Sequence, residues 1–360
     1  MARDEQEVLD AIERRRRRPV RRLLDAHVTL AHGAGGKSSH ALIEALFLPE
    51  LGNPLLDPLA DSALLEANGV GPRLAFSTDS YVVKPLFFPG GDIGELAVNG
   101  TVNDLAMSGA RPLCLSAGFI VEEGFATDEL RRIAASMGRA AREAGVAVAA
   151  ADTKVVERGK ADGVYVNTAG VGVLERTVEL SASAIRPGDR VLVSGTLGDH
   201  GMAIMIARGE LELEVELQSD TAPLASLVAA LLDATGGVRV LRDPTRGGLA
   251  TVMAELALSA EVGIALDERA LPVRAEVNGA CEILGIDPLY VANEGKLVAV
   301  VAPEAADVAL AALRGHPLGA DAALVGEVRG EPPGLVLLET AFGGSRVVDM
   351  LAGDPLPRIC

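Results

Sequence analysis

The chain ends in a cysteine, Cys360, whose sulfur could carry a covalently attached group. Pro355 and Pro357 stand just before it. Each proline removes a backbone donor and resists helix or central-strand pairing, so the last residues are predicted to form an extended arm. A thiol at the tip of such an arm could move between two sites. The alternative is a frayed terminus that ends in cysteine by chance.

Acidic residues beside apolar segments form a second pattern. They stand at predicted strand ends, at helix starts or beside a polar helix face: Asp79, Asp92, Asp104, Asp152 and Asp243. Hard oxygen ligands from several loops, without clustered His or Cys, suit Mg²⁺ on nucleotide phosphates and do not suit zinc. One such aspartate could be a cap or a turn residue. Five in similar settings favour a metal–nucleotide site.

A polar stripe on the predicted helix 93–109 supports this interpretation. Its members, spaced by 3, 4 and 4 residues, are Asp92, Glu95, Asn99 and Asn103. This spacing places them on one helical face, with Asp104 beside them. The segment is otherwise rich in Ala, Gly, Leu and Val, so asparagines are not expected there on an ordinary solvated surface.

A glycine-rich turn precedes a predicted helix over residues 39–48. Gly35, Gly36 and Lys37 could direct amide groups and a positive charge at a phosphate. The turn nearly matches a P-loop, but Ala31 replaces its first glycine and no strand leads into it, which excludes that fold. Only five of the 33 basic residues are lysines, so Lys37 and Lys154 within motifs indicate a need for a compact charge.

Composition excludes several classes of protein. The net charge of −17 argues against nucleic acid as the main partner. No apolar run reaches the roughly 18 residues that span a membrane, and no secretory signal is present. Three separated cysteines without zinc spacing indicate a reducing, cytoplasmic setting. The Arg14–Arg18 run is predicted to be a solvated tail, with binding to an acidic surface or RNA as the alternative.

The order of predicted elements indicates an α/β (α+β) fold with two mixed domains. The first has strands at 74–77, 112–121, 146–151 and 163–174 and helices at 93–109 and 128–144. The second has strands at 190–194, 263–266, 296–302, 323–328 and 335–339 and helices at 201–208, 222–234, 248–260 and 305–314. The predicted units are an Arg-rich extension 1–27, domains 28–178 and 179–350, and a mobile arm 351–360.

Seven segments, in this order, carry a resemblance to a known family: Gly33–Lys37, Ser77–Asp79, Val102–Ala110, Asp152–Lys154, Arg242–Gly248, Ala292–Gly295 and Pro357–Cys360. Over about residues 28–360, the chain resembles the HypE family of hydrogenase maturation proteins, described as carbamoyl dehydratases. That family belongs to the superfamily of aminoimidazole ribonucleotide synthetase and selenophosphate synthetase. The N-terminal extension has no counterpart in this resemblance.

The resemblance implies a fold, an activity and partners. The fold is two α/β domains of the aminoimidazole ribonucleotide synthetase-like type. The first domain would bind ATP, and the first domains of two subunits would pair to form a homodimer. A carbamoyltransferase, HypF, would load a carbamoyl group onto Cys360. The protein would then use ATP and Mg²⁺ to dehydrate the thiocarboxamide to a thiocyanate. The cyanide would pass to iron on a HypC–HypD complex, for the centre of a [NiFe] hydrogenase.

The resemblance also implies roles for single residues. Four acids match positions that hold Mg²⁺–ATP in the superfamily: Asp79, Asp92, Asp104 and Asp243. Lys37 matches the lysine of a mobile phosphate-covering loop, and Gly35, Gly36, Asn103 and Asp152 complete the predicted nucleotide site. Lys154 and Glu294 match residues near the docked thiol. Glu294 is the candidate base and Lys154 the group that orients the carbamoyl oxygen, although these two roles could be exchanged.

Three other functions are alternatives at this point. Selenophosphate synthetase relies on a reactive cysteine or selenocysteine just before the loop lysine, where this chain has Ala34, Gly35 and Gly36. Aminoimidazole ribonucleotide synthetase would not require a terminal cysteine. A non-catalytic carrier or scaffold for maturation partners would need the tail but no turnover. ATP turnover that depends on a carbamoylated tail separates an enzyme from a carrier.

Overall fold

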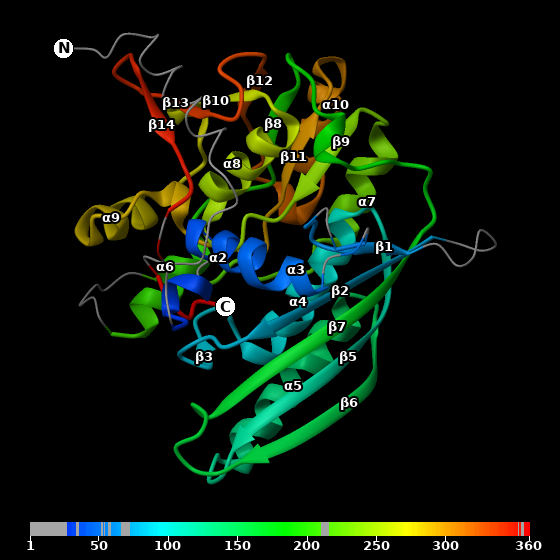
Figure 1. Ribbon diagram of the computed structural model, residues 1–360, viewed down its shortest axis with the longest axis vertical. Helices are drawn as coiled ribbons and strands as arrows, with labels where there is room; N and C mark the ends of the chain where they lie inside the picture. Colours follow the sequence, from blue (N-terminus) through cyan, green and yellow to red (C-terminus); the bar gives the residue numbers. More distant parts are fainter. Residues whose placement is uncertain are drawn as a thin grey trace.

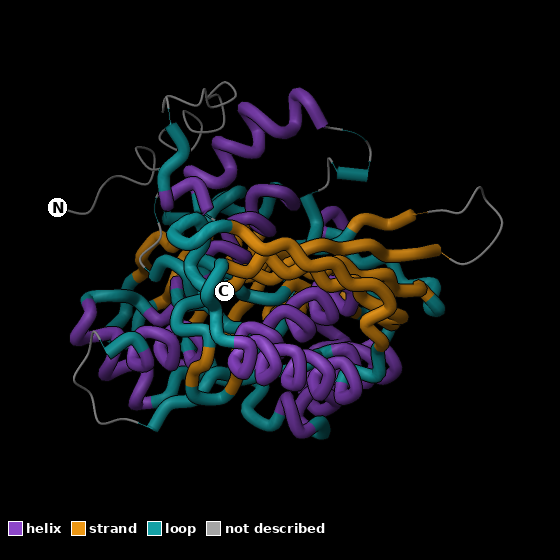
Figure 2. Tube along the Cα trace, turned by 90° about the horizontal axis from the view of Figure 1, so that it is seen from below, coloured by secondary structure: helices purple, strands orange, loops and turns teal. Residues whose placement is uncertain are grey.

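The computed structural model describes residues 27–33, 36–51, 53, 55–56, 59–65, 73–209, 216–351, 353 and 356–360. Apart from His27, the predicted N-terminal extension lies outside the described residues, and so does Gly35. The described part consists of two sheets with their covering helices (Figures 1 and 2). No helix in these ranges is both long and apolar enough to cross a membrane.

The first domain is built on a five-stranded sheet in the order β1-β2-β7-β5-β6. Its strands are β1 (Ala63–Leu65), β2 (Arg73–Tyr81), β5 (Arg111–Glu122), β6 (Ala147–Val156) and β7 (Val164–Leu174). Neighbouring strands are antiparallel except β5 and β6, which are parallel. Helices α4 (Ile93–Met107) and α5 (Thr127–Glu143) cover one face of this sheet, as Figure 2 shows from below.

Alternation of side chains decides which face of β2 is buried. Ala75, Ser77 and Tyr81 are buried, whereas Phe76 and Ser80 are exposed, as the period of two of a strand requires. The buried set faces α4. The exposed set lies on the opposite face, which we call the open face of the first sheet.

Helix α4 is buried on nearly all sides because it packs between the first sheet and the second domain. It contacts β2 and β7 on one side and helix α7 (Ala225–Ala234) and strand β9 (Val238–Arg242) on the other. This position explains its high content of Ala, Gly, Leu and Val. Its first turn begins at Asp92, whose side chain accepts from the backbone N–H groups of Gly94 and Glu95.

The second domain holds a seven-stranded sheet in the order β14-β13-β10-β12-β8-β11-β9. Its remaining strands are β8 (Arg190–Val193), β10 (Gly263–Asp267), β11 (Val298–Val301), β12 (Ala323–Arg329), β13 (Val336–Glu339) and β14 (Ser345–Val348). Only the β10–β13 pair is parallel among the pairings described. Its other helices are α6 (Asp199–Ala207), α8 (Gly248–Ala260), α9 (Ala275–Leu284) and α10 (Ala306–Arg314).

Short elements complete the described chain. The N-terminal part forms a 3₁₀ turn (Leu30–Gly33), α2 (Lys37–Leu42), a π turn (Ile43–Phe47) and α3 (Leu48–Leu51). A small hairpin of β3 (Phe87–Phe88) and β4 (Gly91–Asp92) precedes α4. The helix predicted over 39–48 is thus present but contains a π turn in its middle.

The predicted fold class of two mixed α/β domains is confirmed, and the boundary between residues 178 and 179 stays a prediction. Two predicted strand ends are wrong. Strand β2 continues through Asp79 because Thr168 of β7 pairs with it, and β6 continues through Asp152 because Gly118 of β5 does the same. Asp79 and Asp152 therefore lie inside strands and not in loops at their ends.

Candidate functional site

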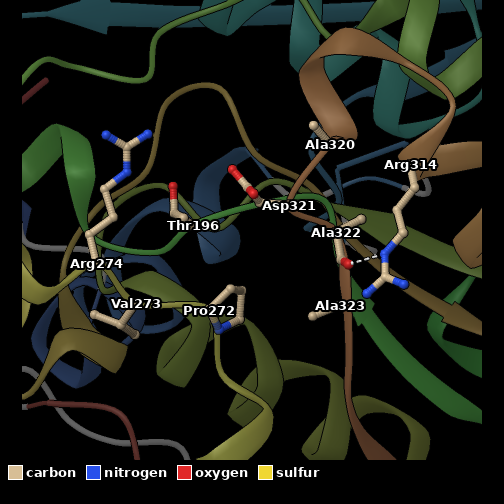
Figure 3. A pocket seen from close by; sticks show the side chains of 9 residues that line it. All are labelled: Thr196, Pro272, Val273, Arg274, Arg314, Ala320, Asp321, Ala322 and Ala323. Carbon is tan, nitrogen blue, oxygen red and sulfur yellow. Dashed lines mark hydrogen bonds between the residues drawn. The ribbon is translucent and has the colours of Figure 1, made fainter.

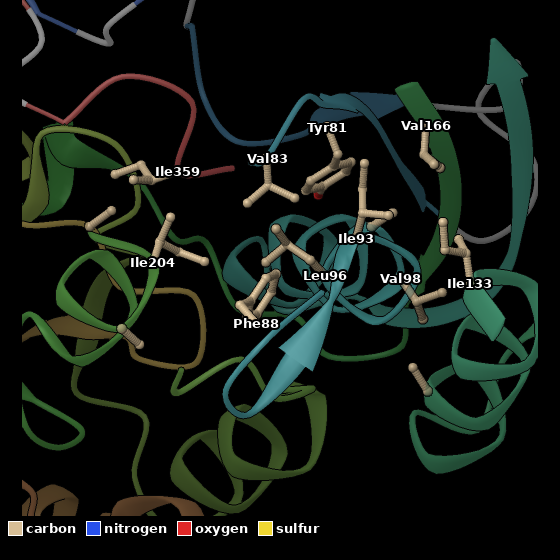
Figure 4. Packing of buried hydrophobic residues seen from close by; sticks show 14 of the residues in the cluster. Tyr81, Val83, Phe88, Ile93, Leu96, Val98, Ile133, Val166, Ile204 and Ile359 are labelled. Atoms are coloured by element: carbon tan, nitrogen blue, oxygen red, sulfur yellow. The ribbon is translucent and has the colours of Figure 1, made fainter. Parts of the chain in front are cut away.

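The last five residues, 356–360, are docked against the body of the protein, and we call them the terminal arm. Leu356 and Ile359 are 1% and 3% exposed. Figure 4 shows Ile359 beside Ile204 of α6 and Val83, which belong to the same apolar cluster. The predicted extended arm is therefore anchored by two apolar side chains in this structure, while Cys360 remains partly exposed.

Backbone pairing fixes the end of the terminal arm beside the segment that follows β2. The N–H of Val82 donates to an oxygen of the terminal carboxylate of Cys360 at 3.1 Å, and the N–H of Lys84 donates to the carbonyl oxygen of Arg358 at 3.1 Å. The negative charge at Cys360 is the main reason why the pKa of Arg246 is raised, followed by Asp79 and Glu294. The chain terminus thus lies among charged side chains from both domains.

Four predicted residues come together at this place, and we call them the acidic cluster: Asp79, Asp104, Asp243 and Glu294. Strand β2 and helix α4 supply the first two, the end of β9 supplies the third, and the segment before β11 supplies the fourth. Because the two domains meet here, the cluster exists only in the folded protein.

Burial raises the pKa values of Asp104 and Asp243. Removal from water raises the pKa of Asp104 well above its usual value, and Asp243 raises it further. The Ser77 hydroxyl donates to Asp104 at 2.6 Å and offsets part of this effect. Burial and then the nearby Asp61 raise the pKa of Asp243 to about 7. Carboxylates crowded in this way repel one another when ionised, and too little positive charge lies nearby to offset the repulsion. They therefore favour binding of a cation.

Glu294 is a buried carboxylate of the acidic cluster, with 4% of its surface exposed. Burial raises its pKa well above the usual value, and Asp243 and Asp79 add to the shift. Among the described residues, its Oε1 atom has no hydrogen-bond partner. Its backbone N–H donates to Asp220 at 3.0 Å, and Asp220 also accepts from Lys296 at 3.0 Å. The main chain is therefore held firmly while one carboxylate oxygen is left for a ligand.

Asp61, an acid that no sequence pattern indicated, also belongs to this region. The guanidinium of Arg242 lies 2.8 Å from Asp61, and it donates to Glu255 at 3.2 Å. Burial raises the pKa of Asp61, and Arg242 opposes the shift. Asp61 stands in a loop without a strand or glycine signal, so no sequence pattern marked it. Arg246 lies in the segment Arg242–Gly248 that carries the family resemblance, and its position three residues after Asp243 was the signal that could have indicated it as a site residue.

Asn103 and Asp92 are occupied by structural bonds. Asn103 donates to the carbonyl oxygens of Ala222 and Glu294 at 3.1 Å each, and it accepts from the N–H of Leu224 at 2.7 Å. Its amide therefore ties α4 to the second domain. Asp92 caps α4 through Oδ1, which also accepts from the Ser136 hydroxyl. Asn103 reaches the acidic cluster only through the backbone carbonyl of Glu294, and Asp92 is engaged at the start of α4, so their binding roles stay predictions.

Asp152 and Lys154 lie on the open face of the first sheet. They pair with each other at 2.5 Å, and their side chains are 72% and 69% exposed. Ala151 shares a row with Asp79 across the sheet, so Lys154, three residues further on, points to the opposite face. Three strand spacings also separate β6 from β2, about 14 Å. Within one subunit, Lys154 therefore does not meet the thiol, contrary to the expectation.

Lys37 contacts the base of the C-terminal segment and not the acidic cluster. Its Nζ atom lies 2.6 Å from Asp349, and its N–H donates to the carbonyl oxygen of Leu351 at 2.8 Å. A Cβ on Gly36 would lie 2.2 Å from that same oxygen, so only glycine fits there. The predicted phosphate role of Lys37 would require this ion pair to open.

A separate surface pocket lies in the second domain (Figure 3). Its polar lining comes from Thr196, Arg274, Arg314 and Asp321, and Arg314 donates to the carbonyl oxygen of Ala322 at 2.8 Å. None of the predicted site residues lines it. The acidic cluster and the terminal arm, not this pocket, therefore form the candidate active site.

The candidate site contains the ligand types that Mg²⁺ prefers, but not a complete metal site. Among the described residues, no three acid, His or Cys side chains meet closely enough to enclose a metal ion by themselves. Mg²⁺ usually takes one or two protein carboxylates and completes its shell with water and substrate phosphates. An incomplete carboxylate set with raised pKa values and an orphaned Glu294 oxygen fits that kind of binding.

Comparison with known proteins identifies the family. Residues 60–174 match the N-terminal domain of AIR synthase related proteins, and residues 186–337 match their C-terminal domain. The carbamoyl dehydratase HypE of Bradyrhizobium diazoefficiens is 56% identical over 92% of this chain and 96% of its own length. That of Escherichia coli is 50% identical over 93% and 99%.

Solved structures agree with these matches. A HypE–HypF complex superposes with a TM-score of 0.82 at 49% identity, covering 86% of this chain and all of the other. A HypE structure in complex with ATP superposes with a TM-score of 0.78 at 49% identity, covering 93% of this chain and all of the other. The chain belongs to the HypE family of carbamoyl dehydratases, within the AIR synthase related proteins.

Proposed function

We propose that this protein dehydrates a carbamoyl group carried on its own terminal cysteine, with consumption of ATP. The substrate is the S-carbamoyl form of Cys360, a thiocarboxamide, and the product is its thiocyanate. The observation that carries the proposal is the docking of the last residue beside a buried acidic cluster from both domains. A carrier without catalysis would not need its tail placed among such carboxylates.

The chemistry requires that an amide oxygen becomes a leaving group. ATP supplies the phosphoryl group that the thiocarboxamide oxygen takes up, with release of ADP. The carbon–oxygen bond then breaks, inorganic phosphate leaves, and both N–H protons are lost as the C≡N bond forms. The sulfur–carbon bond stays intact throughout. The protein must therefore position phosphates, accept protons and exclude water.

Asp79, Asp104 and Asp243 would hold Mg²⁺ together with phosphate oxygens in this proposal. A HypE structure in complex with ATP supports nucleotide binding in the family. The pKa of Asp243 is raised to about 7 by burial and then by the nearby Asp61, and a cation here would offset both effects, which supports a cation at this place. When bound, Mg²⁺ neutralises charge on the phosphates during transfer. Lys37 would add its charge once released from Asp349.

Glu294 would act as the base. Glu294 and Cys360 both interact electrostatically with the Arg246 guanidinium. The raised pKa of Glu294 makes it a stronger proton acceptor once ionised, and the Arg246 guanidinium favours the ionised form. Its Oε1 atom, which has no hydrogen-bond partner in the part of the chain that the structure describes, is the oxygen that we assign to the N–H protons of the substrate.

Lys154 would reach the substrate from a second subunit. The open face presents exposed apolar side chains, among them Phe76 and Ile120, and β6 is an edge strand of the first sheet. Such a face and edge favour pairing with another copy. In a homodimer through this face, the exposed Lys154 could orient the carbamoyl oxygen in the partner's site. This arrangement accounts for its distance from Cys360 within one subunit.

HypF would load Cys360, and a HypC–HypD complex would receive the cyanide at iron. A solved HypE–HypF complex supports the first partner, and the family resemblance supports the second. Both steps need the terminal arm outside the site, since a partner enzyme must reach the sulfur. The reaction therefore requires an arm that leaves and returns.

Intact mass of the C-terminal peptide tests the proposal. The protein is incubated with HypF, carbamoyl phosphate and ATP, with and without Mg²⁺. Gain of one carbamoyl group, followed by loss of one water only with ATP and Mg²⁺, is the expected result. A stable carbamoyl adduct under all conditions would instead establish a carrier. Cys360→Ala is the control, and it should gain no mass while ATP binding persists.

A further inference from the structure

Both ends of helix α6 touch the terminal arm. His200 is the second residue of α6 and Arg208 directly follows its last turn, so they are separated by about 12 Å along the helix. Between them, Gly201 lies under the anchor residue Leu356, and a Cβ at Gly201 would lie 3.4 Å from its Cδ1 atom. The helix thus forms a support along which the arm is laid.

His200 holds the peptide bond next to the terminal residue. Its Nε2 atom lies 2.6 Å from the carbonyl oxygen of Ile359, and its Nδ1 atom lies 2.8 Å from the Ser219 hydroxyl. A carbonyl oxygen can only accept, so Nε2 carries the hydrogen and Nδ1 accepts from Ser219. Phe88 contacts the ring edge-on, at 5.7 Å between centroids, and His200 is fully buried. Its orientation is therefore fixed.

Arg208 joins the arm to the segment after β2. Its Nη2 atom donates to the carbonyl oxygens of Pro357 and Arg358 at 2.6 Å each. Its Nε atom donates to the carbonyl oxygen of Lys84 at 2.8 Å. One guanidinium thus binds three carbonyl oxygens, which is an arrangement that lysine cannot reproduce.

The carbonyl oxygens of residues 357–359 and the terminal carboxylate of Cys360 each accept a hydrogen bond from the body of the protein. All of these contacts are made to the backbone of the arm, and none of them involves the sulfur of Cys360. We propose that His200 and Arg208 are positioning residues of a latch that holds the arm whatever group its sulfur carries. The latch would hold the free thiol, the thiocarboxamide and the thiocyanate alike.

The effect of the latch on the reaction rests on the proposed function. Loading by a partner enzyme needs the arm released, whereas dehydration needs it docked. Weakening the latch should therefore favour loading and oppose dehydration. A residue that only stabilised the fold would depress both steps together.

Trimming by a carboxypeptidase measures the latch without any carbamoyl chemistry. The full-length variants Arg208→Met and His200→Leu should lose Cys360 and Ile359 faster than the unchanged protein, by about fivefold or more for the loss of one or two hydrogen bonds. Arg208→Lys and His200→Gln each retain one donor group and should give intermediate rates. Arg176→Gln is the matched control, because Arg176 pairs with Asp233 on α7 and its loss should not change trimming.

The two half-reactions complete the test. With HypF, Arg208→Met should be loaded at least as fast as the unchanged protein but dehydrated several-fold more slowly. Equal trimming rates in folded, ATP-binding variants would overturn the latch. If trimming accelerates but no variant is ever loaded, the latch stands and the proposed function fails. The latch would also be refuted if loading and dehydration fell in parallel while trimming stayed constant.

Discussion

At the scale of single residues, the acidic cluster places negative charge where water is scarce. Asp104, Asp243 and Glu294 all have raised pKa values, and burial is the largest cause for each. Such an arrangement lowers the stability of the protein without its ligands. Perturbed carboxylates of this kind are typical of functional sites, where a ligand compensates the cost.

The pH dependence of stability follows from Asp243. Its pKa is about 7 in the folded protein against 3.8 ordinarily, so the folded state binds more protons between these values. Stability should therefore fall as pH rises from 4 to 7, by up to about 4 kcal/mol for this group alone. Urea unfolding without nucleotide measures this loss. Asp243→Asn should flatten the profile, and an unchanged slope in that variant would contradict the assignment.

Glu294→Gln should separate loading from dehydration. The amide keeps the shape of the side chain but cannot accept the N–H protons, so dehydration should fall by about 10²–10⁴-fold while carbamoyl loading continues. Mass spectrometry of the C-terminal peptide would show the thiocarboxamide accumulating. Glu304→Gln, an exposed acid in the second domain, is the control and should dehydrate normally. Full dehydration by the Glu294 variant would remove it from the mechanism.

At the scale of elements, sequence patterns predicted the helices and strands better than their ends. The run 248–260 is a helix as predicted, because its glycine start and apolar spacing are both local signals. Strand β6 continued past its prediction because β5 supplies pairing partners for Asp152 and Lys154, which is a non-local cause. Strand β9 was not predicted, since a short segment with charged residues resembles a loop. The same limitation hid Asp61 and the contacts of α6 with the terminal arm.

Asn103 shows how one side chain on α4 holds two domains together. Asn103→Ala would leave the carbonyl oxygens of Ala222 and Glu294 and the N–H of Leu224 without this partner. The free energy of unfolding should drop by about 2–4 kcal/mol, measured by urea titration. Asn99→Ala, on the same helix face, removes a single hydrogen bond to Thr221 and should cost less. Equal losses would argue against the special role of Asn103.

At the scale of the whole molecule, two features of the proposed reaction lie apart within one subunit. The terminal arm is docked beside Glu294 and Arg246, while Lys154 stands on the open face of the first sheet. The sequence could place Lys154 in a motif near the thiol by family resemblance. It could not reveal whether Lys154 serves its own subunit or a second copy, because that depends on whether and how two copies pair.

Mixing two inactive variants tests whether Lys154 acts between subunits. Cys360→Ala has no carrier and Lys154→Ala lacks the orienting charge, so each alone should produce no thiocyanate. If Lys154 serves the partner's site, a heterodimer of the two contains one complete site, since the Cys360→Ala subunit supplies its lysine to the loaded arm of the other. An equimolar mixture, exchanged under mild dissociating conditions, should then regain about one quarter of the full activity.

The outcome distinguishes the two arrangements because a lysine that served its own subunit would leave every site of the mixture incomplete. Asp104→Asn replaces Lys154→Ala in the control mixture. Asp104 lies on the buried side of the first sheet, bonded to Ser77, and belongs to its own subunit's acidic cluster. That mixture should stay inactive, because the loaded arm would always dock at a site that lacks the carboxylate. Activity in both mixtures would instead show that the arm, and not the lysine, crosses between subunits.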